Sequence, residues 1–219
     1  NALQMAKNTK TPHNDIIAEL LNNIGCIQFE IDSETKAMKC FKDALTLLQK
    51  DITQSVFDRH EPLYNHVLAK LSTVRTNLAY VHLRMKNADM AATAFEESQR
   101  DFKICLKTHH PFVIAMMDYL AMAYVRRGHK DDAMNTYSKM LTAKIEAHGA
   151  EDKECAAILT KIGLLQIRAQ DKAGVDAITK KIQKCLGDND HLQKERFERL
   201  LKVTSRISGL KPINARKSK

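Results

Sequence analysis

Three arginines, Arg84, Arg126 and Arg168, recur at intervals of 42 residues. An arginine side chain is always charged, and its planar group of N–H donors binds carboxylates through paired hydrogen bonds. Such a series on a repeating structure would form a stripe of these groups. Two roles are open for it. Either the stripe binds carboxylates of a partner, or each arginine pairs with carboxylates or helix-terminal carbonyls of its own chain.

Residues that could act in catalysis or metal binding are present, but not at the spacings that such sites use. His60 and His66 are six residues apart across a proline, and His109 and His110 are adjacent, so neither pair has the spacing of helical zinc ligands. The chain has no nucleophile elbow and no glycine-rich phosphate loop. We therefore expect no enzyme, no metal site and no cofactor.

The five cysteines are far apart and form no Cys-x-x-Cys pair. This usage is typical of reduced thiols, so we expect an intracellular and most simply a cytoplasmic protein. The chain opens on Asn1 rather than Met, which indicates a trimmed or processed piece and leaves organelle targeting open.

The composition favours helices. The chain has 219 residues, of which 44% are hydrophobic and 28% charged, with 7 Gly and 4 Pro. So few turn residues argue against an all-β fold. No apolar run reaches the roughly 20 residues of a membrane-spanning helix, so no transmembrane segment is expected. The length is ample for one domain or two small ones.

A pattern repeats four times, with offsets of 54, 42 and 42 residues. Each copy has an aliphatic residue followed by a small one: Ile24-Gly25, Leu78-Ala79, Leu120-Ala121 and Ile162-Gly163. In three copies an alanine and then an aromatic residue follow: Ala37 and Phe41, Ala91 and Phe95, Ala133 and Tyr137. Small residues let two helices approach closely, and the aromatic fills the space toward the next pair. We expect helices over 14–31, 34–52, 63–85, 88–107, 111–127, 130–147, 152–169 and 172–186.

This pattern resembles the tetratricopeptide repeat (TPR). The 42-residue period and the His110-Pro111 start of the third copy resemble the longer repeat of kinesin light chains, whose Asn-Asn-Leu-Ala element is echoed at 21–24 and 76–79. Copies three and four depart from that element, with Asp118-Tyr119 and Thr160-Lys161. The resemblance implies an all-α, right-handed superhelical solenoid. It also implies a non-enzymatic scaffold or adaptor for protein–protein interaction.

We expect the following organisation: an N-terminal extension over 1–13, four helix pairs over 14–52, 63–107, 111–147 and 152–186, a capping helix over 188–208 and a basic tail over 209–219. Residues 188–219 hold nine basic and four acidic residues, and so account for more than half of the formal net charge of +9. A terminal amphipathic helix would close the last apolar face of a solenoid.

The resemblance implies that certain positions of the first helix in each pair face a concave groove. Our candidate partner-binding residues are Asn23, Asn77, Tyr80, Arg84, Tyr119, Met122, Arg126, Lys161 and Arg168. The two asparagines would hold a peptide backbone through amide hydrogen bonds. The two tyrosines and the methionine would make apolar contacts, and the four basic residues would attract acidic groups. The same positions include Asn22 and Cys26.

We expect a protein or peptide partner of acidic character. Chaperone-binding members of the family hold a terminal carboxylate with a set of Lys, Asn, Asn, Lys and Arg, of which this chain keeps only Asn77. Binding of an Hsp70 or Hsp90 tail is therefore disfavoured. Three alternatives stay open: a structural subunit of a larger assembly that uses the convex face and the basic tail, a nucleic-acid-binding helical repeat, and a regulatory module of an enzyme with its catalytic domain elsewhere.

Overall fold

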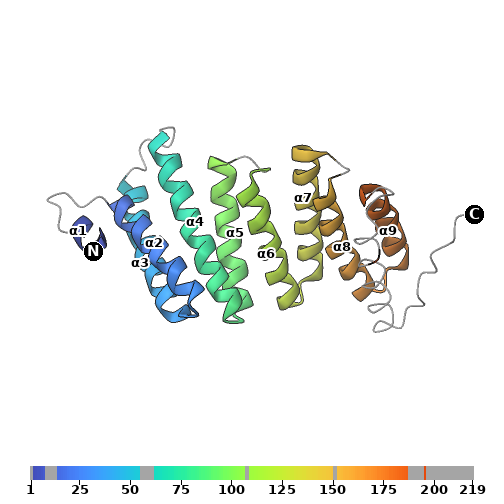
Figure 1. Cartoon of the computed structure of the whole chain (residues 1–219), viewed down its shortest axis with the longest axis horizontal. Coiled ribbons are helices and arrows are strands. Elements are labelled where there is room, and N and C mark those ends of the chain that lie inside the picture. Colours follow the sequence, from blue (N-terminus) through green and yellow to red (C-terminus); the bar gives the residue numbers. More distant parts are fainter. Residues whose placement is uncertain are drawn as a thin grey trace, which may run out of the picture. The chain divides into compact units, whose positions relative to one another are not determined.

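The computed structural model describes residues 2–7, 14–54, 62–106, 109–149, 152–186 and 195, and within these residues the chain forms helices without strands (Figure 1). The helices are α1 (Ala2–Lys7), α2 (Asn14–Glu30), α3 (Glu34–Gln54), α4 (Pro62–Arg84), α5 (Ala88–Cys105), α6 (Pro111–Arg127), α7 (Lys130–His148), α8 (Lys153–Arg168) and α9 (Lys172–Leu186). The expected all-α repeat is confirmed.

Every helix expected between residues 14 and 186 is present, with bounds that differ from the expected ones by at most two residues. Helix α1 was not expected, because 1–13 has no repeat pattern. The predicted capping helix over 188–208 and the tail over 209–219 lie outside the described residues, except for Glu195, which is helical.

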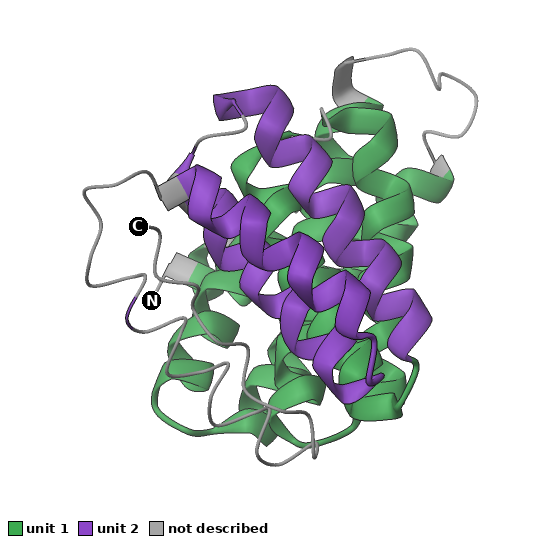
Figure 2. Cartoon of the chain, turned by 90° about the vertical axis from the view of Figure 1, so that its right-hand side faces the viewer, with its two compact units in different colours: residues 1–129 green, residues 130–219 purple. Residues whose placement is uncertain are grey.

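The chain divides into two compact units, residues 1–129 and residues 130–219 (Figure 2). In the first unit each of the helices from α2 to α5 packs against the next one along the chain, and α4 also contacts both α2 and α6. Helices α2, α4 and α6, the first helices of three pairs, therefore lie side by side. The face that they share is where the groove was expected.

Small residues allow this packing. Ala79, Ala91 and Ala121 are fully buried between helices of the first unit. A side chain at Gly25 has no room, because an added Cβ would lie 2.6 Å from Cε1 of Phe41. Phe41 is itself only 1% exposed and belongs to the hydrophobic core of the unit. The repeated small residue is thus needed for close helix–helix contact.

The described part of the second unit contains α7, α8 and α9, with α8 packed against both neighbours. Ala133 and Tyr137 of α7 are buried. In the fourth copy Val175 and Ile178 of α9 are buried in the core. Gly163 of α8 faces Ile178, and a Cβ added at Gly163 would lie 3.3 Å from Cγ2 of Ile178. The apolar contacts of the repeat therefore persist where its sequence match is weakest.

The first helix of each pair ends in the same way. The residue at the equivalent position adopts a left-handed conformation: Asp32 (φ 57°), Lys86 (φ 64°), Gly128 (φ 82°) and Gln170 (φ 60°). A left-handed residue ends a helix and satisfies its last carbonyls. Two helices are also capped where they begin: Asp152 and Asp171 accept hydrogen bonds from backbone N–H groups at the start of α8 and α9. These ends keep the connections short.

Candidate functional site

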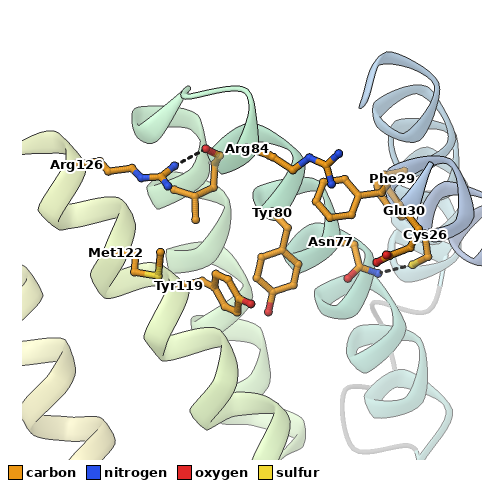
Figure 3. Close-up of a pocket in the computed structure, with 11 residues that line it drawn as sticks. Cys26, Phe29, Glu30, Asn77, Tyr80, Arg84, Tyr119, Met122 and Arg126 are labelled. Atoms are coloured by element: carbon orange, nitrogen blue, oxygen red, sulfur yellow. Dashed lines mark hydrogen bonds between the residues drawn. The ribbon is translucent and has the colours of Figure 1, made fainter. Parts of the chain in front are cut away.

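Six of the nine candidate partner-binding residues line one pocket of about 490 Å³ in the first unit. They are Asn77, Tyr80, Arg84, Tyr119, Met122 and Arg126. Figure 3 shows them projecting from α4 and α6 toward residues of α2. The remaining wall is formed by Cys26, Phe29, Glu30, Phe41 and Leu83. The side-by-side arrangement of α2, α4 and α6 brings these residues together from sequence positions far apart.

Aromatic rings form the middle of the pocket. The ring of Tyr80 meets the ring of Tyr119 edge to face, with centroids 4.5 Å apart, and meets Phe95 at 5.3 Å. Tyr119 remains 40% exposed. Burial raises the pKa of Tyr80, with smaller contributions from Tyr119 and Asp118, so its hydroxyl stays neutral at physiological pH. The pocket thus offers an accessible aromatic surface with a polar edge.

Arg84 is engaged within the chain. Its Nε donates to Oε1 of Glu34 at 3.0 Å, and its Nη2 donates to Oδ1 of Asp32. Its guanidinium carbon lies 4.2 Å from the centroid of the Phe29 ring. The pKa of Glu34 is lowered by a hydrogen bond from its own backbone N–H and by Arg84. Two carboxylates therefore pair with Arg84 and leave it no free positive charge, and its guanidinium group lies over the Phe29 ring.

Arg126 has a different environment. Its Nη1 donates to the backbone carbonyl of Leu83 at 2.5 Å, near the end of α4 (Figure 3), and its side chain is exposed. In the described parts of the chain no carboxylate forms an ion pair with it. The positions equivalent to Asp32 and Glu34 in the next repeat are Lys86 and Ala88. The charge of Arg126 therefore remains available at the α6 end of the pocket.

The α2 end carries the opposite charge. Glu30 is exposed there, and among the residues that the structure describes no basic group pairs with it. Nearby, Nδ2 of Asn77 donates to Oδ1 of Asn22 at 2.8 Å and to Sγ of Cys26 at 3.5 Å. Burial, and secondarily Glu30, raise the pKa of Cys26, so its thiol stays protonated.

Three candidate residues lie elsewhere. Asn23 is exposed on α2 and does not line the pocket, whereas its neighbour Asn22 pairs with Asn77. Lys161 and Arg168 belong to the second unit. The Nζ of Lys161 lies 5.9 Å from the ring centroid of Tyr137, and Arg168 is exposed at the end of α8.

Sequence reasoning did not select five of the pocket residues: Cys26, Phe29, Glu30, Phe41 and Leu83. Cys26 was among the groove-facing positions and could have been chosen. Glu30 stands in the first copy where the later copies have the recurring arginine, which is a signal for an opposite charge at that end. Phe41 and Leu83 follow the core pattern of the repeat, and nothing in that pattern indicates that their edges reach a pocket.

In the described part of the chain, no group of three or more His, Cys, Asp or Glu side chains could hold a metal ion, and no helix has the length and apolar character needed to cross a membrane. His82 is 7% exposed, and its Nδ1 has no hydrogen-bond partner within the described structure. Burial, and secondarily Lys42, lower its pKa. These observations place His82 in the interhelical core.

Comparison with known families finds the tetratricopeptide repeat at residues 18–50 and again at 70–146. No curated protein matches the sequence significantly. Among solved structures, BtubC (BKLC) from P. vanneervenii is similar with a TM-score of 0.67 and 14% identity, over 94% of this chain and 80% of that one.

Two further structures have similar folds. A kinesin light chain candidate from Podosopora anserina with nearly identical TPR-like repeats has a TM-score of 0.68 and 12% identity, over 91% of this chain and 90% of that one. Aspartyl phosphate phosphatase F from Bacillus subtilis has a TM-score of 0.64 and 11% identity, over 91% of this chain and 48% of that one. At these identities the likeness is one of fold.

Proposed function

Because the chain belongs to the tetratricopeptide repeat family, whose fold supports protein–protein interaction, we propose that it is a non-enzymatic scaffold that holds a segment of a partner protein in the pocket of its first unit. The observation that carries this proposal is the convergence of six candidate residues from two helices on one pocket. Its volume of about 490 Å³ lies in the range of ligand-binding pockets.

The chemistry of the pocket suits an apolar side chain on an extended segment. Tyr119 is accessible, and Met122 beside it is a flexible side chain that adapts to different shapes. Asn77 uses its N–H group within the chain, while its carbonyl oxygen has no partner among the described residues. That oxygen can accept a backbone N–H of the bound segment.

The charge of Arg126 favours an acidic group of the partner at the α6 end of the pocket. Arg126 is exposed and makes one hydrogen bond to a carbonyl, so most of its N–H donors remain available. Arg84 already pairs with Asp32 and Glu34 and contributes shape rather than free charge. Clamping of a terminal carboxylate, as in chaperone-binding relatives, is not part of the proposal, because Asn77 alone remains of that set.

Selection of binders from a phage-displayed library of random linear peptides tests the proposal. Clones that bind the wild-type chain should lose binding to Met122→Glu, which places a charge in the pocket, and keep binding to Met90→Glu. Met90 is 58% exposed on α5 and lies outside the pocket, so it is a matched control. Equal binding to both variants, or the absence of any selected clone, would contradict a peptide-binding pocket.

A further inference from the structure

The pocket has opposite charges at its two ends. Glu30 on α2 and Arg126 on α6 both line it, and neither forms an ion pair within the described structure. Between them, Arg84 on α4 pairs with Asp32 and Glu34, so it offers no free positive charge. Figure 3 shows Arg126 and Glu30 on opposite sides of the two tyrosines. Among its described residues, the pocket therefore has one unpaired negative charge at its α2 end and one unpaired positive charge at its α6 end.

The remaining acidic group near the pocket does not alter this separation. Asp118 of α6 lies close enough to Tyr80 to affect the pKa of its hydroxyl. It is half-buried and has an interaction of its own within the chain. Cys26 and Tyr80 are both neutral, because burial raises the pKa of each. Among the described residues that line the pocket, the charges without an ion pair are thus those of Glu30 and Arg126.

The distance between the two ends corresponds to a short extended peptide. Helix α4 lies between α2 and α6, and packed helices have axes about 8–10 Å apart. The axes of α2 and α6, and with them the two ends of the pocket, are therefore about 16–20 Å apart. An extended chain rises about 3.3 Å per residue, so about five or six residues span this distance. Side chains of an extended segment alternate between two faces, and two that face the pocket must be an even number apart. A separation of about six residues satisfies both conditions.

We propose that the pocket selects a partner segment with a basic side chain at one position and an acidic side chain about six residues away, with apolar side chains facing the pocket between them. The basic group pairs with Glu30 and the acidic group with Arg126. The apolar groups lie on Tyr80, Tyr119 and Met122. This inference rests on the proposed function of the same pocket, and it replaces a uniformly acidic partner with a dipolar one.

Four blocked fluorescent peptide pools test the inference by fluorescence polarisation. Each pool has the same randomised apolar residues between its ends and carries Lys and Glu, two Glu, two Lys or two Gln at the end positions. The wild-type chain should prefer the Lys–Glu pool by about three- to fivefold over the Gln pool, as exposed ion pairs allow. It should bind the two singly signed pools less tightly than the Lys–Glu pool, because each places like charges together.

Charge reversals give the sharper test. Glu30→Lys should switch the preference to the two-Glu pool, and Arg126→Glu should switch it to the two-Lys pool. The double variant should again prefer the Lys–Glu pool, because the segment can bind in the opposite direction. Asp43→Lys is the control, since Asp43 is exposed on α3 outside the pocket and its reversal should leave the order unchanged.

A second variant leaves the pocket residues intact. Lys86→Asp with Ala88→Glu gives Arg126 the acidic neighbours that Arg84 has at equivalent positions, and should abolish the advantage of the acidic end. If the pools bind, Met122→Glu blocks them and no variant changes their order, the charge inference is wrong while the peptide-binding pocket stands. If no pool binds the wild-type chain, both the inference and the proposed function are wrong.

Discussion

Replacing Gly25 with alanine should destabilise the first unit, although alanine is the better helix former. In an exposed helix the change from glycine to alanine contributes about 0.8–1.0 kcal/mol in favour of folding. At Gly25 the new methyl group would lie 2.6 Å from Cε1 of Phe41, inside van der Waals contact. Phe41 is 1% exposed and surrounded by core residues, so its ring cannot simply turn aside.

The magnitude follows from these two opposing effects. Overpacking of a core costs about 1–3 kcal/mol, so Gly25→Ala should lower the free energy of unfolding by about 1 kcal/mol net. Gly163→Ala is the matched control at the equivalent position of the fourth copy. Its Cβ would lie 3.3 Å from a methyl group of Ile178, a much milder contact. It should therefore be neutral or stabilising by about 0.5 kcal/mol.

Urea unfolding followed by far-ultraviolet circular dichroism measures both variants, and hydrogen exchange of peptides from α2–α3 and α8–α9 assigns each effect to its unit. Phe41→Leu provides a further check, because removing the ring should cost about 1 kcal/mol less in the Gly25→Ala background than in the wild type. Equal stabilisation by Gly25→Ala and Gly163→Ala, or strictly additive effects with Phe41→Leu, would refute the close contact of α2 with α3.

Three further predictions concern charges. Arg126→Glu should weaken binding of the Lys–Glu peptide pool about three- to fivefold and change the free energy of unfolding by less than about 1 kcal/mol, as fluorescence polarisation and urea unfolding would show. A large loss of stability with intact binding of that pool would assign Arg126 to the fold instead. The side chain of Arg75 is 14% exposed and pairs with Glu97 and Asp101. Arg75→Ala should therefore lower the free energy of unfolding by about 2 kcal/mol, and a change within measurement error would contradict these ion pairs. Because burial lowers the pKa of His82 below its ordinary value of 6.5, the unfolded chain binds the proton more tightly. Stability should therefore fall as the pH drops below about 6.5 toward the lower pKa of the folded state, and His82→Gln should reduce this slope in urea titrations at several pH values.

The helices and their pairing could be predicted from sequence because the repeat imposes local and periodic requirements. A small residue is needed wherever two helices come close, as at Gly25 beside Phe41, and its recurrence reveals the register of every copy. The helix ends could be predicted as well, since the expected and observed bounds of the helices between residues 14 and 186 differ by two residues at most. Helix α1 carries no such recurrence, so the sequence pattern gave no reason to expect it.

The candidate site was predictable only in part. Groove-facing positions follow from helix phase, and six of the selected residues do meet in one pocket. Phase does not determine which of two adjacent amides turns inward: Asn22 pairs with Asn77, while Asn23 is exposed. It also does not show that a core residue such as Phe41 lines a cavity. Those features depend on side-chain packing between helices far apart in sequence.

The arginine series shows how one repeat position can have two physical roles. Arg84 and Arg126 occupy the same place at the end of successive first helices. Arg84 has Asp32 and Glu34 within hydrogen-bonding distance, and these carboxylates precede and begin the neighbouring α3. At the equivalent positions before and in α5 the chain has Lys86 and Ala88, so within the described structure Arg126 has only the Leu83 carbonyl as a partner. Whether such an arginine stabilises the fold or remains available for a partner is therefore decided by two residues in the adjacent turn, and both can be read from the sequence once the repeat register is known.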